Sequence, residues 1–241
     1  MRARDVVGFA GAAGVAAVLA AAFTKMPAAG GAVHPYRDLV LPAALRAGTP
    51  NLVSSVNFDL RALDTLGEET IVAAAVVGVL ALLQPPRRKV PDPPGQVMPA
   101  VRFAGWLLLP VAALLGLDVI VHGHLTPGGG FQGGVVLATG WHLLYLSGSY
   151  PALLKLRPLG SLEYAEAAAT AAYVLVGLAG LFVTGSFLAN VLPLGSFGSL
   201  LSAGTVPVLS VIVGVEVAAG VVVLLSRFLA HALGHADEES R

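Results

Sequence analysis

Residues 206–229 read VPVLSVIVGVEVAAGVVVLLSRFL, and this stretch decides the class of fold. It holds only two charged residues, Glu216 and Arg227, among apolar and small ones. A helix of about 20 mostly apolar residues crosses a hydrocarbon core of about 30 Å. We therefore expect a transmembrane helix, with Glu216 near its middle and about 15 Å from the nearer end at about 1.5 Å per residue.

The composition of the whole chain points to the same class of protein. Of its 241 residues, 56% are hydrophobic and 12% are charged, and the mean hydropathy is +0.81. Soluble domains have about 25% charged residues, so these values exclude a soluble globular protein, and they also exclude a disordered one. The net charge is zero, which leaves no basic surface for nucleic acid. We predict an all-α polytopic membrane protein.

Six stretches are candidates for membrane spans, so we expect about six transmembrane helices. They are Val6–Phe23, 64–83, Arg102–His122, Phe131–Tyr150, Ala165–Leu188 and Val206–Leu229. With the N-terminus inside, ten of the 14 Lys and Arg residues lie on the cytoplasmic side. This bias predicts a multi-pass protein of the plasma (inner) membrane with both termini in the cytoplasm. Arg2 and Arg4 leave open a cleaved signal peptide, but the length of the first stretch favours a retained span.

A polar, proline-rich segment divides the predicted spans into two groups. Arg87–Pro99 reads RRKVPDPPGQVMP, a composition that is typical of a linker. It separates a predicted two-span unit, residues 1–90, from a predicted four-span unit, residues 91–241.

Glu216 is the sharpest candidate for a functional residue. Insertion scales assign about 2.5–3.5 kcal/mol to an ionised acid at the centre of a spanning helix, so such residues are rare. One interpretation is a carboxyl group that relays protons or sodium ions through the membrane. The other is a protonated carboxyl group that hydrogen-bonds to a neighbouring helix and holds the two helices together.

A second polar group precedes the span at 64–83. Helical spacing places four of its residues on one face: Asn57, Arg61, Asp64 and Glu68. We expect an amphipathic helix on the outer surface that bends into the membrane near Gly67. The acids here would form a mouth that concentrates cations: Asp59, Asp64, Glu68 and Glu69. The alternative is a solvated face with one Arg61–Asp64 ion pair, and it suits Asp59 and Glu69 better than the other two acids.

Asp118 and His122 are four residues apart near the end of the third predicted span, with His124 just beyond. We interpret them as a protonatable surface cluster, because His titrates near physiological pH. A zinc site is disfavoured, because it requires three or four converging ligands. The chain has no Cys, and it lacks the motifs of nucleophilic, zinc-hydrolase or dinucleotide-binding enzymes. The sequence therefore predicts no catalytic residues, no metal and no cofactor.

A glycine-rich segment joins the third and fourth predicted spans. His124–Gly134 reads HLTPGGGFQGG, and glycines four residues apart let a helix begin with its backbone close against a neighbour. We interpret it as a rigid docking corner made of Pro127, Gly128, Gly129, Gly130, Phe131, Gly133 and Gly134. An anion site at the helix N-terminus is the less favoured alternative, since the lysine of a phosphate-binding loop is missing.

Two motifs in the second half resemble a known family. GHLTPGGGFQGGVVLA at Gly123–Ala138 and VGVEVAAG at Val213–Gly220 are similar to the MnhB family, the B-type subunits of Mrp/Mnh-type multisubunit Na+/H+ antiporters. A similar four-helix unit belongs to membrane-bound hydrogenases related to respiratory complex I. The resemblance covers about residues 95–241.

The first half resembles a different component of the same assemblies. NLVSSVNFDLRALDTLGEETIVAAAVVGVLALL at Asn51–Leu83 is similar to the C-terminal end of the large A-type subunits of the antiporters, and to the small E-type subunits of the hydrogenases. The shared pattern keeps Asn51, Val53, Val56, Asp59, Arg61, Asp64, Thr65, Gly67 and Glu68. The chain thus resembles two neighbouring subunits fused at the Arg87–Pro99 linker.

The resemblance implies a membrane subunit, not an enzyme, in a complex that exchanges sodium ions for protons. Its partners would be the other subunits, Na+ and H+, and the bilayer. We expect Glu216, Asp64 and Glu68 to relay or bind ions, with Asp59, Asp118 and His122 as weaker candidates. Two alternatives stay open: a scaffold subunit without an ion path, and a subunit of a hydrogenase-like energy-converting complex.

Overall fold

The computed structural model describes residues 3–26, 34–83, 97–148 and 159–239. The chain is 78% helical and its described ranges contain no strands, which confirms the predicted all-α class. It divides into two compact units, Met1–Leu39 and Val40–Arg241. The predicted linker, Arg87–Pro99, and the predicted boundary at residue 90 fall mainly or wholly outside the described residues.

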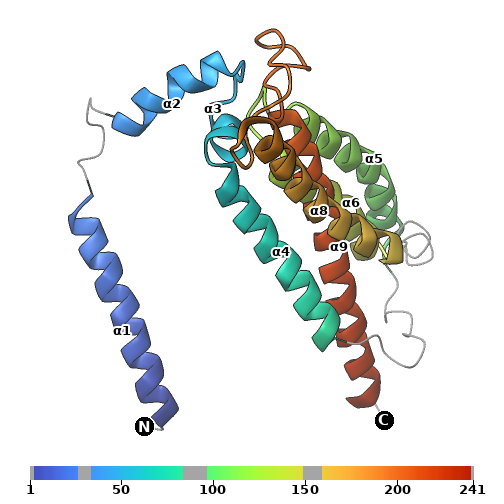
Figure 1. The fold of residues 1–241 in the computed structure, drawn as a ribbon. Helices are drawn as coiled ribbons and strands as arrows, with labels where there is room; N and C mark the ends of the chain where they lie inside the picture. The colour runs from blue at the N-terminus through green and yellow to red at the C-terminus, as the bar shows by residue number, and fades with distance from the viewer. Residues whose placement is uncertain (1–2, 27–33, 84–96, 149–158, 240–241) are drawn as a thin grey trace. The chain divides into compact units, whose positions relative to one another are not determined.

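The first unit contains helix α1, Ala3–Thr24, and the beginning of helix α2, Pro35–Arg46 (Figure 1). The stretch Asp5–Thr24 is long and apolar enough to cross a membrane. Apolar side chains cover all sides of this helix, which is the pattern of a helix surrounded by lipid or by partner subunits.

Helix α9, Val206–Glu239, is the central helix of the second unit (Figure 1). Three helices pack directly against it: α4 (Ala62–Leu82), α6 (Gly130–Leu146) and α8 (Leu159–Thr184). Helix α5, Pro99–Val121, packs mainly against α6. The chain itself buries 61% of the most apolar window of α9, but only 17–22% of those in α4, α5 and α8. The stretch at 206–229 therefore forms the core.

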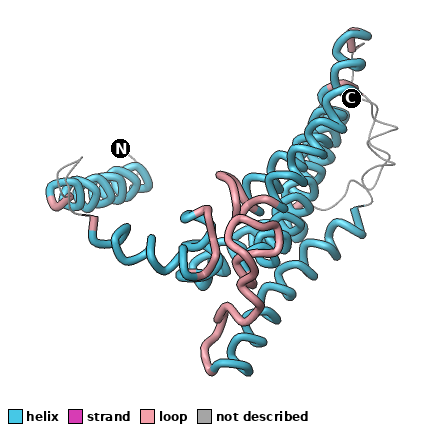
Figure 2. Tube along the Cα trace, turned by 90° about the horizontal axis from the view of Figure 1, so that it is seen from above, coloured by secondary structure: helices cyan, strands magenta, loops and turns pink. Residues whose placement is uncertain are grey.

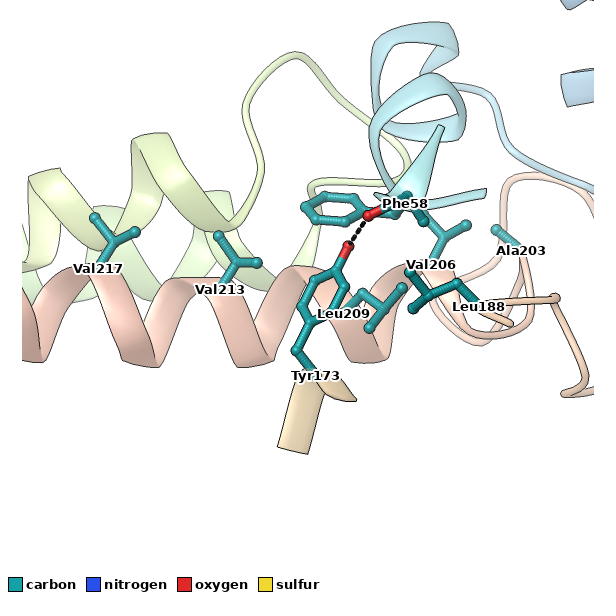
Figure 3. Close-up of a cluster of buried hydrophobic side chains, with 9 residues drawn as sticks. Phe58, Tyr173, Leu188, Ala203, Val206, Leu209, Val213 and Val217 are labelled. Atoms are coloured by element: carbon teal, nitrogen blue, oxygen red, sulfur yellow. Dashed lines mark hydrogen bonds between the residues drawn. The ribbon is translucent and has the colours of Figure 1, made fainter. Parts of the chain in front are cut away.

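Loops gather at one end of these helices, where two short elements precede α4 (Figure 2). They are α3, Leu52–Ser55, and a π-helical turn η1, Val56–Leu60. Phe58 of η1 belongs to a hydrophobic cluster that includes Tyr173 of α8 and Leu209 of α9 (Figure 3). The Tyr173 hydroxyl donates a hydrogen bond of 3.0 Å to the carbonyl oxygen of Ala62, so the start of α4 is tied to α8.

Five described helices meet the length and apolarity of a membrane span: α1, α4, α5, α8 and α9. The sixth predicted span, Phe131–Tyr150, corresponds to α6, which ends at Leu146 and has 17 residues. Seventeen residues extend about 26 Å, just short of the hydrocarbon thickness. Helix α8 ends at Thr184, four residues before the predicted end, because Gly185 adopts a φ of +80° that stops the helix.

The bend before α4 lies at Arg61, so the expectation of a bend near Gly67 is wrong. Helix α4 runs without a break from Ala62 to Leu82 and includes Gly67. Arg61, with φ −136° and ψ 35°, separates it from the π-helical turn. A π turn is wider than an α turn, so the helix loses its regular phase there and restarts after Arg61.

Candidate functional site

Two carboxyl groups meet between α4 and α9. Glu69 and Glu216 are both fully buried, and their side chains lie close enough to interact. None of their four carboxyl oxygens has a hydrogen-bond partner in the described part of the chain. Buried carboxyl groups in a membrane helix are costly, so two that face each other from different helices form the strongest candidate site.

The local fold of the first motif explains why Glu69 faces inward. Asn51 caps α3, because its Oδ1 accepts hydrogen bonds from the backbone N–H groups of Val53 and Ser54 at 3.1 and 3.5 Å. After η1, the Thr65 hydroxyl donates a hydrogen bond of 2.8 Å back to the carbonyl oxygen of Asn57. The restarted helix then buries one stripe of residues at heptad-like spacing: Ala62, Thr65, Glu69 and Val76.

A third carboxyl group approaches from α8. Glu166 is buried, its Oε1 has no hydrogen-bond partner in the described residues, and it acts electrostatically on Glu216. It lies beside Gly220, one turn after Glu216, where an added Cβ atom would be in ordinary contact with Cγ of Glu166 at 3.7 Å. Farther along, Glu163 and Arg227 form an ion pair of 2.8 Å between α8 and α9. Acidic groups thus continue along the α8–α9 contact beyond Glu216.

Glu69 also lines a partly open cavity of about 420 Å³. Its walls come from the α3–η1–α4 segment and from the first turn of α6 with the glycine corner, so both sequence motifs line one space. The polar side chains that line it are Ser54, Asn57, Thr65, Glu68, Glu69 and Gln132. The cavity contains no basic side chain among its lining residues.

The glycine corner brings α6 against two neighbouring helices. Gly128 and Gly129 have φ values of +135° and +130°, a region that residues with a side chain rarely adopt. A Cβ atom on Gly133 would lie 2.7 Å from the carbonyl oxygen of Gly116 in α5. A Cβ atom on Gly134 would lie 2.9 Å from the carbonyl oxygen of Gly214 in α9. The contacts of this corner are therefore made within the chain itself.

Pro127 and Phe131, the two corner residues that are not glycines, are exposed. Phe131 lines the cavity, and Asn51 ties the first motif to the segment just before the corner. The Asn51 Nδ2 group donates hydrogen bonds of 2.7 Å to the carbonyl oxygens of Gly123 and Thr126.

The other acids of the expected mouth are more exposed than Glu69. Asp64 is exposed and forms an ion pair with Arg61, and Glu68 is exposed while lining the cavity. Asp59 is half-buried in η1, outside the spans. Its burial raises the pKa of its carboxyl group above the ordinary value, and a hydrogen bond with the Asn190 side chain partly offsets that rise.

The structure separates the histidine cluster into two sites. Asp118 and His122 form an exposed pair at 2.9 Å. His124 is fully buried, with Nε2 placed 3.4 Å from the carbonyl oxygen of Ser199. The described residues contain no group of three or more His, Cys, Asp or Glu side chains placed to hold a metal ion.

The sequence favoured the solvated face over the cation mouth for Glu69, and it indicated only a structural role for Glu166, as an acid that complements the helix dipole at the start of its helix. The signal for Glu69 was the apolar stripe of α4, since Ala62, Thr65 and Val76 lie seven, four and seven residues away on the same helical face. The signal for Glu166 was its spacing from Glu163, Thr170 and Tyr173, which places all four on one face of α8.

Comparison with known proteins identifies the family. Residues 100–223 match the family model described as a domain related to the MnhB subunit of Na+/H+ antiporter. An uncharacterized protein of Methanocaldococcus jannaschii is 31% identical over 195 residues, which cover 71% of this chain and 74% of that protein. A probable K+/H+ antiporter A/B subunit of Rhizobium meliloti is 31% identical over 127 residues, 42% of this chain but 12% of that protein.

Two solved complexes contain chains of similar fold. One is the membrane-bound sulfane sulfur reductase, an archaeal respiratory membrane complex, with a TM-score of 0.73 and 27% identity over 94% of this chain and 98% of that one. The other is the Mrp complex from Dietzia sp. DQ12-45-1b, with a TM-score of 0.70 and 30% identity over 97% of this chain and 26% of that one. The chain therefore belongs to the MnhB family and is a multi-pass membrane subunit of an antiporter-like complex.

Proposed function

We propose that this chain is a subunit of a cation/proton antiporter complex in which the Glu69–Glu216 pair carries protons. One observation supports this assignment above the others: two fully buried carboxyl groups from different helices lie together, and one of them lines a cavity. The glycine corner and Asn51 fix the positions of the helices that carry the Glu69–Glu216 pair. The interface carboxyl groups would be contributed by both halves of the chain.

Elementary electrostatics gives the pair its chemistry. Two carboxylates at short range in a medium of low dielectric constant repel each other strongly, so the pair retains a shared proton. Uptake of a second proton and its later release then form one carrier step. The proton enters from the cavity at Glu69 and moves to Glu216 on α9.

Glu166 offers the next acceptor along α8. From there the Glu163–Arg227 ion pair leads toward the end of the α8–α9 contact that, in our proposed orientation, faces the cytoplasm. The proposed setting is the plasma membrane, with both termini cytoplasmic and with Na+ and H+ as the exchanged ions. The three Lys residues lie outside the predicted spans, so this chain would contribute to an ion path at a subunit boundary.

The test is a charge-neutral substitution in the intact complex. Glu216→Gln and Glu69→Gln should each leave the complex assembled, because Gln keeps the shape of Glu, and should abolish sodium-dependent proton movement in inverted vesicles. Asp38→Asn is the control, because it neutralises an exposed acid outside the site. An assembled Glu216→Gln complex with full exchange would disprove the relay. Loss of assembly in both variants would favour a scaffold role.

A second candidate function comes from the structural comparison. The related chain of the sulfane sulfur reductase complex is matched over 98% of its length, so a redox-driven complex would also have a place for a subunit of this size. Purification of the native complex through a tag on this chain distinguishes the two. Iron–sulfur subunits in the purified complex would indicate a redox-driven assembly, and their absence with the antiporter subunits present would indicate an antiporter.

A further inference from the structure

We propose that the cavity beside Glu69 is a binding site for a hydrated monovalent cation. The proposal deepens the proposed function and depends on it, since the bound cation would exchange with a proton of the Glu69–Glu216 pair. Its basis is the placement of unpartnered, buried oxygen atoms in one partly open space.

The lining residues have the chemistry of a cation site. Hard cations prefer carboxylate, amide, hydroxyl and carbonyl oxygens as ligands. Six lining side chains carry such oxygens, two of them carboxyl groups, and no lining side chain is basic. An anion would meet two carboxyl groups and no compensating charged side chain, so the anion site considered from the sequence is disfavoured here.

Two of these oxygen donors are buried and lack a partner. Ser54 is 2% exposed and Glu69 is 0% exposed, and both line the cavity. The Ser54 hydroxyl has no hydrogen-bond partner in the described residues. Apart from the proton that we propose it shares with Glu216, the Glu69 carboxyl group has no hydrogen-bond donor there either. Buried polar atoms are nearly always satisfied in native proteins, so buried oxygens on the wall of one cavity favour the binding of a ligand there.

The size and charge of the cavity favour a hydrated monovalent ion. A volume of about 420 Å³ leaves room for a cation with several waters of its hydration shell. The first turn of α6 also lines the cavity, and the positive end of its helix dipole weakens the attraction, which favours binding that is readily reversed.

Neighbouring serines provide a matched pair of variants. Ser54 and Ser55 are both buried and neither hydroxyl has a partner in the described residues, but only Ser54 lines the cavity. We therefore compare Ser54→Ala with Ser55→Ala, and add Glu68→Gln as a second cavity variant. If one variant fails to assemble, the other still tests the site.

The experiment measures cation binding to the intact complex, purified through a tag on this chain. Radioactive Na+ is titrated by equilibrium dialysis at constant ionic strength held with choline, and K+ and Mg²⁺ are used as competitors. Ser54→Ala and Glu68→Gln should weaken one class of Na+ site roughly tenfold, which corresponds to about 1.4 kcal/mol. Ser55→Ala should bind as the unchanged complex does, and K+ should compete more effectively than choline.

Unchanged Na+ binding in both cavity variants would overturn the proposal, and so would a site that only Mg²⁺ occupies. The result of this Na+ binding experiment can be distinguished from the result of the Glu216→Gln exchange test. Weakened binding in the cavity variants, together with full exchange by Glu216→Gln, would leave the cation site standing without the relay. Unchanged binding, together with loss of exchange in Glu216→Gln, would leave the relay standing without this cation site.

Discussion

At the scale of single residues, the unusual feature is that polar groups are buried where their burial is costly. Apart from the proton that we propose the two carboxyl groups share, the oxygens of Glu69 and Glu216 have no hydrogen-bond donor in the described residues. A structural role gives little reason to retain such a pair, because two apolar residues of similar volume would pack without the desolvation penalty. A transport role requires groups that can accept and release a charge.

His124 supplies a prediction about acid stability. Burial lowers the pKa of its ring below the ordinary value of 6.5, while the carbonyl oxygen of Ser199 acts in the opposite direction. The unfolded chain therefore binds a proton at this ring more readily than the folded chain. The resulting stability is complete above about pH 6.5 and declines as the pH falls below it.

We expect the melting temperature of the purified complex to fall between about pH 7.5 and pH 5.5, and His124→Gln to reduce that fall. His34→Gln is the control, because His34 is exposed. Thermal scans in detergent at the two pH values measure the difference. An identical pH dependence in His124→Gln and in the unchanged complex would contradict the argument.

Residue-level sequence reasoning found Glu216 because its surroundings are uniformly apolar over a full span. The solvated face was favoured for Glu69 because the polar helical face was extended from Asn57 to Glu68 as though the helix were continuous. The π turn at Val56–Leu60 changes the helical phase before α4 begins. No residue type in that turn indicates a π turn from the sequence. Whether an exposed acid such as Asp64 takes part depends on partner subunits, and the sequence of one chain does not contain them.

At the scale of elements, glycine contacts decide how closely the helices approach. Helix α6 begins in the glycine corner, and its first residue, Gly130, touches the backbone of α9 at Ser210. The Ser210 hydroxyl in turn donates a hydrogen bond of 2.8 Å to the carbonyl oxygen of Ile120. Three helices therefore meet at one point with little space for added atoms.

Gly130→Ala should destabilise this junction, because the new Cβ atom would collide with the carbonyl oxygen of Ser210. Overpacking of this kind costs about 1–3 kcal/mol. The control is Gly78→Ala in α4, where a Cβ atom meets nothing within 4 Å inside the chain. Thermal unfolding and gel filtration of the two complexes should show a loss for Gly130→Ala alone. Equal stability of both variants would mean that the corner is more pliable than its geometry indicates.

The helices themselves could be predicted from hydrophobic runs, but their order around α9 could not. Every span is apolar, so composition does not tell which one the chain buries and which ones face lipid. The order of the helices is decided by close contacts at three glycines, Gly116, Gly133 and Gly214. These contacts can be identified only once the helices are placed side by side.

At the scale of the whole molecule, α4 is the element that joins the two predicted units. It precedes the predicted linker, yet it packs on α8 and α9, which follow the linker. Its buried stripe includes Glu69, so the candidate site requires residues from both sides of Arg87–Pro99. A fusion would thus keep together two pieces whose interface holds the carboxyl pair.

This arrangement predicts that the covalent link is dispensable. Residues 1–90 and 91–241, expressed together as separate chains, should assemble, because the Tyr173–Ala62 hydrogen bond and the α4 stripe lie within the interface. A tag on either piece should then recover the other, with proton exchange retained in vesicles. Glu69→Gln in the first piece should abolish proton exchange, while residues 1–90 stay bound to residues 91–241. Recovery of residues 91–241 alone would show that α4 depends on the peptide connection, and that the predicted boundary does not separate two subunits.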